Sequence, residues 1–178
     1  MAGMERTTRI CSASQLNPKL LRALSEYCGK NKLGDPARDA VLCCETVTDR
    51  NAMNRIAAWL DGSPNTTEQL GLILTGRVLF WARAGDRSAT IALHANLDEF
   101  SARPYKVRFS KEAGLEICGA IGEKKDRVAG RFAFGPQDDA RKFTDAVVQA
   151  VETANPPPKK WDIPWLRWLT RRGDKQDR

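Results

Sequence analysis

The chain has 178 residues, 42% of them hydrophobic and 29% charged, with a formal net charge of +7 at pH 7. This composition is typical of one globular domain with flanking segments, large enough to bury a substantial core. It excludes a bilayer-spanning segment, because no apolar run approaches the roughly 18 residues that one requires. The first residues also lack the hydrophobic stretch of a signal peptide, so we expect a cytoplasmic protein.

The positive charge is concentrated at the two ends of the chain. Residues 1–34 contain six Lys/Arg and two Asp/Glu, and residues 155–178 contain seven and three. Residues 35–154 contain 16 basic and 17 acidic residues, so this central body is nearly neutral. A body that binds a nucleic-acid backbone would need a cationic face. The composition therefore argues against nucleic acid as a partner of the body.

The N-terminal part divides into a segment without a pattern and a helix. Residues 1–15 show no hydrophobic periodicity and are expected to be disordered. Asn17-Pro18 is a favourable helix start, and apolar residues then recur at helical spacing. We therefore predict an N-terminal helix within residues 16–34, ending at Gly29 or Gly34.

The next part of the chain predicts a strand, a helix and a hairpin. Residues 40–47 form the first strand candidate, and apolar residues at helical spacing over 53–60 predict an inserted helix after it. Two apolar runs follow, 70–74 and 78–81, on either side of a turn in which Gly76 can adopt positive φ. Because both runs are apolar at consecutive positions, we expect this hairpin at the centre of a folded sheet.

The remaining elements are strands followed by a closing helix. Alternating patterns predict strands over 88–94, 97–105, 115–121 and 128–134. Gly135-Pro136 breaks the sheet before a helix over 137–154. The predicted fold class is α+β, mainly β: a bent antiparallel barrel of about seven strands capped by the C-terminal helix. The apolar face of that helix consists of Ala140, Phe143, Val147, Ala150 and Val151.

Three stretches resemble bacterial pleckstrin-homology-like (PH-like) domains. They are the hairpin Leu-Ile-Leu-Thr-x-Arg-x-Leu-Phe-Trp-Ala, the pair Ala140 and Phe143 in the closing helix, and Val-Leu-Cys-Cys-Glu-Thr at 41–46. The last is similar to the first strand of an uncharacterised group of these domains. The resemblance covers about residues 38–154. It implies a seven-stranded barrel capped by a helix and used for binding rather than catalysis.

The resemblance does not bring a lipid head-group site with it. Eukaryotic relatives often bind phosphoinositides through basic residues in the first inter-strand loop. In this chain the corresponding segment is a predicted helix that contributes only Arg50 and Arg55. The chain is thus divided into a disordered N-terminus, a helix (16–34), a PH-like domain (35–154) and a C-terminal tail (155–178).

No catalytic or metal-binding constellation is predicted. The five cysteines are scattered without a C-x-x-C pair and His94 is the only histidine, which argues against zinc. Glu45 and the Asp98-Glu99 pair are the carboxylates nearest to apolar surroundings, and structural or solvated roles are expected for them. His94 is expected at the rim of a strand. We therefore predict a protein that is not an enzyme and has no cofactor or metal, with at most one reactive thiol.

The C-terminal tail combines aromatic and basic residues after the run Pro156-Pro157-Pro158, which favours a semi-rigid spacer. Such a tail suits a protein interaction or self-association, since Trp and Arg are favoured in binding hot spots. It also suits reversible contact with an anionic membrane surface. A tail without a specific role is the third interpretation. The candidate binding residues are Lys159, Lys160, Trp161, Trp165, Arg167, Trp168, Arg171 and Arg172.

Basic residues in the predicted barrel loops are weaker candidates for binding an anion. A solvated turn is the favoured interpretation of the basic hairpin tip at 124–127. No glycine-rich phosphate cradle accompanies them, because the nearby glycines lie in or beside hairpin turns. The residues are Arg50, Arg55, Lys124, Lys125 and Arg127.

Overall fold

The computed structural model describes residues 4–50, 66–106, 113–122 and 126–156. The inserted helix predicted over 53–60 lies outside these residues. The described elements, in chain order, are β1 (Met4–Cys11), a short 3-10 helix η1 (Ala13–Gln15), α1 (Pro18–Asn31), β2 (Ala40–Arg50), β3 (Thr67–Thr75), β4 (Val78–Gly85), β5 (Ile91–Asn96), β6 (Phe100–Lys106), β7 (Ala113–Ile121), β8 (Asp126–Phe134) and α3 (Asp138–Ala154).

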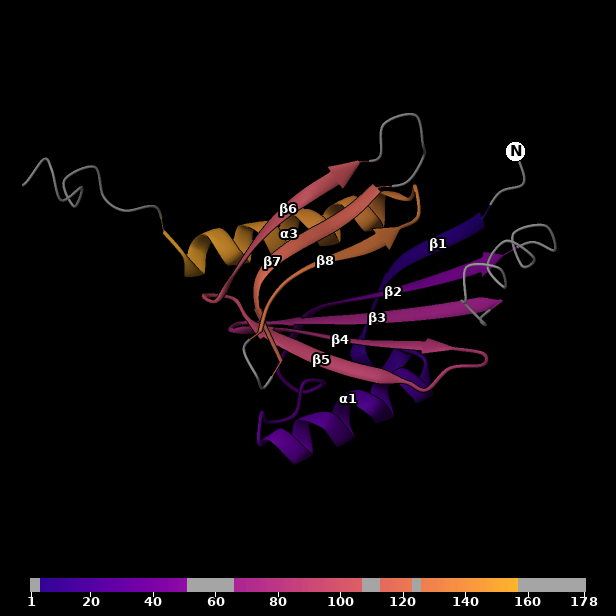
Figure 1. The fold of residues 1–178 in the computed structure, drawn as a ribbon, viewed down its shortest axis with the longest axis horizontal. Helices are drawn as coiled ribbons and strands as arrows, with labels where there is room; N and C mark the ends of the chain where they lie inside the picture. Colours follow the sequence, from indigo (N-terminus) through magenta and orange to yellow (C-terminus); the bar gives the residue numbers. More distant parts are fainter. Residues whose placement is uncertain (1–3, 51–65, 107–112, 123–125, 157–178) are drawn as a thin grey trace, which may run out of the picture.

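These elements form two antiparallel sheets and two long helices (Figure 1). The first sheet has the order β1-β2-β3-β4-β5 and the second the order β6-β7-β8. Helix α1 covers the outer face of the first sheet, while α3 lies against β6 of one sheet and β1 and β2 of the other. The predicted α+β, mainly β class is confirmed. The two sheets are not joined by strand pairing into a closed barrel in the described part of the chain.

The β3–β4 hairpin lies at the centre of the first sheet, as predicted. Leu72, Leu74 and Trp81 point into the core between the two sheets, whereas Ile73 and Phe80 pack beneath α1. A strand that is covered on both faces can be apolar at every position. This double coverage explains why both runs of the hairpin are apolar at consecutive positions rather than alternating.

The hairpin turn differs from the expectation for Gly76. Among the described residues, the glycines with positive φ are Gly34 and Gly122, so Gly76 does not use its conformational freedom. The turn is instead closed by the side chain of Thr75. Its Oγ1 donates to the carbonyl of Val78 at 2.9 Å and accepts from the Val78 amide at 3.0 Å. These two bonds close a turn that does not depend on positive φ at Gly76, in contrast to the prediction.

Helix α1 begins at the predicted residue but ends differently. The Asn17 side chain accepts a hydrogen bond from the Lys19 amide at 2.9 Å, which caps the first turn. Gly29 lies inside the helix, and the chain leaves it at Lys32, whose φ of 55° is left-handed. The prediction that a glycine ends the helix is therefore wrong, and Gly34 follows two residues later with φ 82°. Leu20, Leu24 and Cys28 form its buried face.

The expectation that residues 1–15 are disordered is wrong for β1 and η1. Strand β1 pairs with β2 from Met4 to Cys11 and so adds an eighth strand in the described residues. Its outer edge is covered by α3: the Thr8 amide donates to Gln137 Oε1 and the Ile10 amide to Asp139 Oδ2, both at 3.0 Å. The strand shows no apolar periodicity because buried polar groups, such as the Thr8 hydroxyl, are satisfied by hydrogen bonds.

Helix α3 closes one corner between the sheets, with the buried face that its spacing predicts. Ala140, Phe143, Val147 and Val151 all lie in the core between the two sheets, and Ala150 packs against it. The Asn155 side chain then donates to the Leu97 carbonyl at 2.7 Å. This bond fixes the end of α3 beside the β5–β6 turn, so the position at which the chain leaves the domain is defined.

Candidate functional site

None of the binding residues predicted from the sequence has a described side chain. The tail residues from Lys159 to Arg172 lie outside the described residues, as do Arg55, Lys124 and Lys125. The backbones of Arg50 and Arg127 form the end of β2 and the start of β8. The sites described below are therefore built from other side chains.

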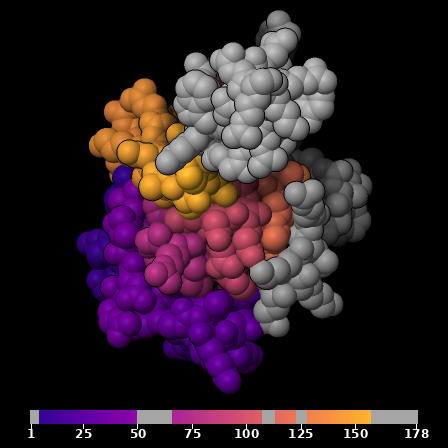
Figure 2. All heavy atoms as spheres, turned by 90° about the vertical axis from the view of Figure 1, so that its left-hand side faces the viewer, coloured from indigo at the N-terminus to yellow at the C-terminus, as the bar shows by residue number. Residues whose placement is uncertain are grey.

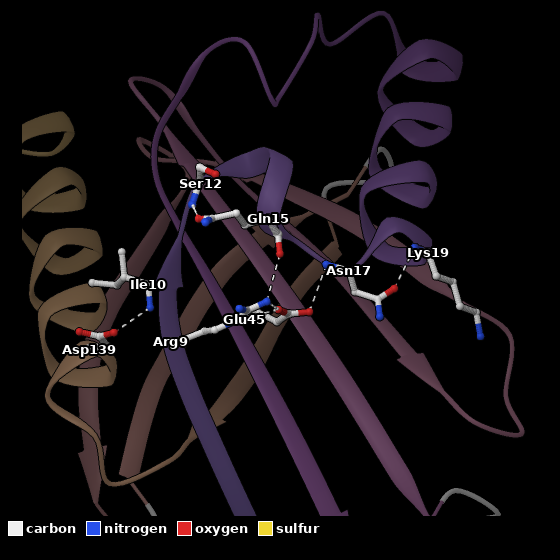
Figure 3. A network of polar contacts seen from close by, with 8 residues as sticks. All are labelled: Arg9, Ile10, Ser12, Gln15, Asn17, Lys19, Glu45 and Asp139. Carbon is white, nitrogen blue, oxygen red and sulfur yellow. Dashed lines mark hydrogen bonds and ion pairs between the residues drawn. The ribbon is translucent and has the colours of Figure 1, made fainter.

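The buried carboxylate Glu45 belongs to a network that joins β1, β2 and the start of α1 (Figure 3). Its Oε2 accepts from Arg9 Nε at 3.1 Å and Nη2 at 2.5 Å, and its Oε1 accepts from the Asn17 amide at 3.1 Å. Arg9 also donates to the Gln15 carbonyl at 3.1 Å. With its two oxygens engaged in this way, Glu45 positions the first helix on the sheet, which is the structural role expected for it.

His94 is buried rather than placed at a strand rim, so that expectation is wrong. It is 8% exposed, and its Nδ1 lies 2.9 Å from the hydroxyl of Tyr27 on α1. Its ring also stacks at a tilt against Phe80, with centroids 6.2 Å apart. The residue lies on the face of the first sheet that α1 covers, where a histidine with a hydrogen-bonding partner is tolerated.

A second carboxylate, Glu116, lies in the middle of a ladder across the second sheet. Arg103 on β6 and Arg131 on β8 are its cross-strand neighbours, and their Nε atoms donate to it at 2.5 Å and 2.9 Å. The hydrogen bond from Arg103, followed by that from Arg131, holds the pKa of Glu116 below its usual range. Arg131 additionally lies over the ring of Tyr105, 5.6 Å from its centroid. The carboxylate is therefore held ionised, unlike a general acid.

A hollow of about 300 Å³ opens between the inner face of the first sheet and β8. We call it the corner hollow. It opens at one corner between the two sheets, whereas α3 fills the opposite corner. Its apolar wall is made by Leu70, Trp81, Leu93 and Phe132, with the Trp81 and Phe132 rings packed edge to face at 5.3 Å. Ile91 at its lip is 59% exposed. The core between the sheets thus continues into an open apolar surface at this corner.

Charged residues line the outer part of the corner hollow. Arg6 and Arg83 outnumber the acidic lining residue Glu68, so the lining carries an excess of positive charge. Arg131 also belongs to the lining, but its guanidinium is bonded to Glu116 on the other face of β8. Arg83 Nη2 donates to Glu68 Oε2 at 2.6 Å, while the Arg83 side chain remains 62% exposed. Arg6 Nε donates to Thr48 Oγ1 at 3.0 Å. Strand pairing explains this rim, because Arg6 is opposite Thr48 and Arg83 is opposite Ile91.

A wider hollow of about 600 Å³ lies where α3 ends, and we call it the exit hollow. Figure 2 shows this face, with the end of α3 in yellow against the pink segment around residue 100. Phe100, Ala102 and Val151 contribute apolar surface, and the lining includes no Lys or Arg. The residues that define it for the argument below are Asp98, Glu99, Phe100, Val151, Glu152 and Asn155.

The cysteines differ strongly in accessibility, which gives a direct test of the packing. Burial raises the pKa of Cys28 and Cys43 to about 11 and that of Cys44 to about 12, and it also raises the pKa of Cys11. Cys118 is exposed on β7. We expect a disulfide reagent such as DTNB to modify Cys118 rapidly at pH 8. The buried thiols should react at least about 100-fold more slowly, because a pKa rise of two units lowers the thiolate fraction by that factor.

The measurement is the time course of DTNB reaction for the native chain and for Cys118→Ser. The fast phase should disappear in the variant, leaving slow modification of the buried thiols. Cys11 is partly exposed, so the double variant Cys11→Ser/Cys118→Ser is measured as well. A fast phase that survives in this double variant would show that α1 or the inner face of the first sheet opens readily. That result would contradict the burial of Cys28, Cys43 and Cys44 described above.

The described residues contain no metal-binding cluster and no membrane-spanning helix. No group of three or more His, Cys, Asp or Glu side chains that could hold a metal occurs among the described residues. In the same part of the chain, neither α1 nor α3 combines the length and apolar composition needed to cross a membrane. Comparison with protein-family models, with curated proteins and with solved structures finds no match. The described residues form a two-sheet α+β structure that includes the corner hollow and the exit hollow.

Proposed function

We propose that this chain is a non-enzymatic binding module of PH-like architecture that self-associates through its C-terminal tail. The order of elements supports the architecture: β2 to β5 in one sheet, β6 to β8 in the other, and then a helix that closes one corner. The engagement of Glu45 and Glu116 by arginines supports binding rather than acid–base chemistry. The addition to this architecture is the N-terminal unit of β1 and α1.

The observation that carries the proposal is the acidic exit hollow at the base of the basic tail. Asp98, Glu99 and Glu152 surround apolar surface from Phe100 and Val151. The tail, residues 155–178, has seven Lys/Arg and three Asp/Glu, and three of the five tryptophans of the chain. A hollow with apolar residues at its floor and acidic residues at its edge complements a segment in which Trp alternates with Lys and Arg.

The proline run favours docking onto a second copy rather than onto the same one. Asn155 is bonded to the Leu97 carbonyl, so the tail starts at the edge of its own exit hollow. Three successive prolines favour an extended spacer of about 3 Å per residue. Such a spacer carries the tryptophans away from the exit hollow of their own molecule. They can then reach the exit hollow of a neighbouring molecule. Reciprocal exchange of the tails between two copies would close a two-fold symmetric dimer.

The experiment compares the solution mass of the intact chain with that of a chain truncated after Pro158. We expect the intact chain to dimerise and the truncated chain to remain monomeric in sedimentation. Asp98→Lys/Glu152→Lys should weaken dimerisation at least about tenfold, as should raising the ionic strength from about 0.05 M to about 0.5 M. Glu26→Lys, on the exposed side of α1, is the matched control and should leave the dimer intact. Equal masses for intact and truncated chains would overturn self-association.

The second candidate function is peripheral binding to an anionic membrane surface, favoured by the alternation of Trp with Lys and Arg in the tail. Liposome sedimentation separates it from self-association. If the intact chain binds anionic but not neutral vesicles, the truncated chain binds neither, and both are monomers, the tail is a membrane tether. If neither chain binds vesicles and truncation lowers the mass, the tail acts on protein.

A further inference from the structure

We propose that the corner hollow is a binding site for a small amphipathic anion, a molecule with a compact apolar body and one carboxylate or phosphate group. This inference is independent of the tail and of self-association, because the hollow is built from β1, β2, β3, β4, β5 and β8. It rests on three properties of the hollow: its apolar wall, its size and the sign of charge at its edge.

The apolar wall continues the core, and the described residues leave it open at the hollow. Trp81 and Leu93 are neighbours across β4 and β5, and Phe132 of β8 packs edge to face on Trp81 from the opposite sheet. Ile91 lies two residues before Leu93 on the same face of β5, and its side chain is 59% exposed. Apolar surface that a ligand removes from water stabilises the complex by about 25 cal/mol per Å². The wall therefore favours a ligand with an apolar body.

The size of the hollow selects a small molecule. Its volume of about 300 Å³ lies at the lower end of the range for ligand pockets. At roughly 30 Å³ per water-sized group, it holds about ten non-hydrogen atoms. A folded peptide segment or a whole lipid exceeds this volume, so we commit to a free ligand of about that number of atoms.

The charges select an anion. Arg6 and Arg83 outnumber Glu68 in the lining. The Arg83 side chain is 62% exposed, and its bond to Glu68 uses one Nη. A guanidinium has five N–H donors and binds carboxylate or phosphate in a forked geometry. Arg83, opposite Ile91 and on the same face of β4 as Trp81, therefore retains donors for an oxyanion whose apolar body lies against Trp81.

Glu68 holds Arg83 in place rather than cancelling the charge of the site. Its side chain is 16% exposed and accepts from Arg83 at 2.6 Å, so the guanidinium is fixed against the sheet without being buried. Fixing a rotamer-rich side chain before the ligand arrives lowers the entropic cost of binding. A site preorganised in this way favours one anion over the equivalent neutral molecule.

The test uses octanoate, which has ten non-hydrogen atoms, and octan-1-ol as the neutral probe, by calorimetry on the full chain. We expect octanoate to bind at least about tenfold more tightly than octan-1-ol, and Arg83→Gln to weaken octanoate at least about tenfold. Arg141→Gln removes an exposed arginine on α3, paired with Asp138 and outside the hollow, and should change nothing. Octyl phosphate serves as the second oxyanion and should behave as octanoate does.

A pair of substitutions at Ile91 keeps the test meaningful even if Arg83→Gln disturbs the sheet. Ile91 is exposed, so either charged residue can be accommodated with little effect on folding. Ile91→Asp should weaken octanoate binding and Ile91→Lys should strengthen it, in opposite directions of several-fold. Equal affinity for octanoate and octan-1-ol would overturn the proposal. So would the same response to Arg83→Gln and Arg141→Gln, or an absence of octanoate binding.

Discussion

Phe143→Ala is expected to lower the free energy of unfolding by about 3–5 kcal/mol, the range for truncating a buried phenylalanine. The side chain is 0% exposed and lies on the face of α3 that fills the corner between the sheets. Its ring meets that of Phe134 at the end of β8 nearly perpendicularly, at 89° and 6.1 Å between centroids. Removing it leaves a cavity between helix and sheet that neither element can close alone.

Urea unfolding followed by circular dichroism measures this change. Lys142→Ala, one residue away with its side chain 70% exposed, is the control and should remain within about 0.5 kcal/mol of the native chain. A loss below about 1 kcal/mol for Phe143→Ala would mean that α3 does not pack in the corner. The description of one closed and one open corner would then fail as well.

The elements that could be predicted from the sequence are those whose burial follows from local spacing. In α3, Phe143 and Val147 are four residues apart and share a helical face whatever the rest of the fold does. The position of the β3–β4 hairpin could be predicted in the same way, since its continuous apolar runs require a covering layer on both faces of the sheet. A closed barrel was predicted, whereas the described strands pair into two separate sheets. Sheet closure depends on long-range pairing that no local pattern records.

The strand β1 and the corner hollow could not be predicted, because their chemistry arises from pairs distant in sequence. Thr8 is a buried polar residue whose hydroxyl meets that of Thr46 at 2.9 Å and accepts from the Gly135 amide at 2.7 Å. A local pattern gives no sign of partners 38 and 127 residues away. Arg6 and Arg83 likewise line one hollow only because strand register aligns the ends of β1 and β4.

The basic residues singled out in the sequence have no described side chains, and the hollows are described from other residues. Charge runs such as Lys124-Lys125 are conspicuous in a sequence, whereas the rim arginines occur singly on strands. Single arginines at alternate strand positions look like ordinary solvated residues. Their common side of the sheet becomes apparent only when the strands are paired, which is why the apolar and cationic character of the corner emerges from the structure.

Gly114→Ala is expected to be the most disruptive single-methyl substitution, lowering the free energy of unfolding by about 3 kcal/mol or more. A Cβ at this position would overlap the backbone carbonyl oxygen of Phe132 on the neighbouring strand β8. On its other side it would lie 3.0 Å from Cε1 of Tyr105, so the new methyl group has no direction of escape. Relief requires β7 and β8 to separate, which weakens the pairing that supports Glu116 and Arg131.

Gly29→Ala provides the matched control, with an effect of the opposite sign. Gly29 lies inside α1, and no atom lies within 4 Å of the position that its Cβ would occupy. Alanine there should raise the free energy of unfolding by about 0.5–1 kcal/mol, because glycine is the poorer helix former. Both variants are compared with the native chain by urea unfolding. Similar stabilities for Gly114→Ala and the native chain would show that β7 and β8 are not paired in this register.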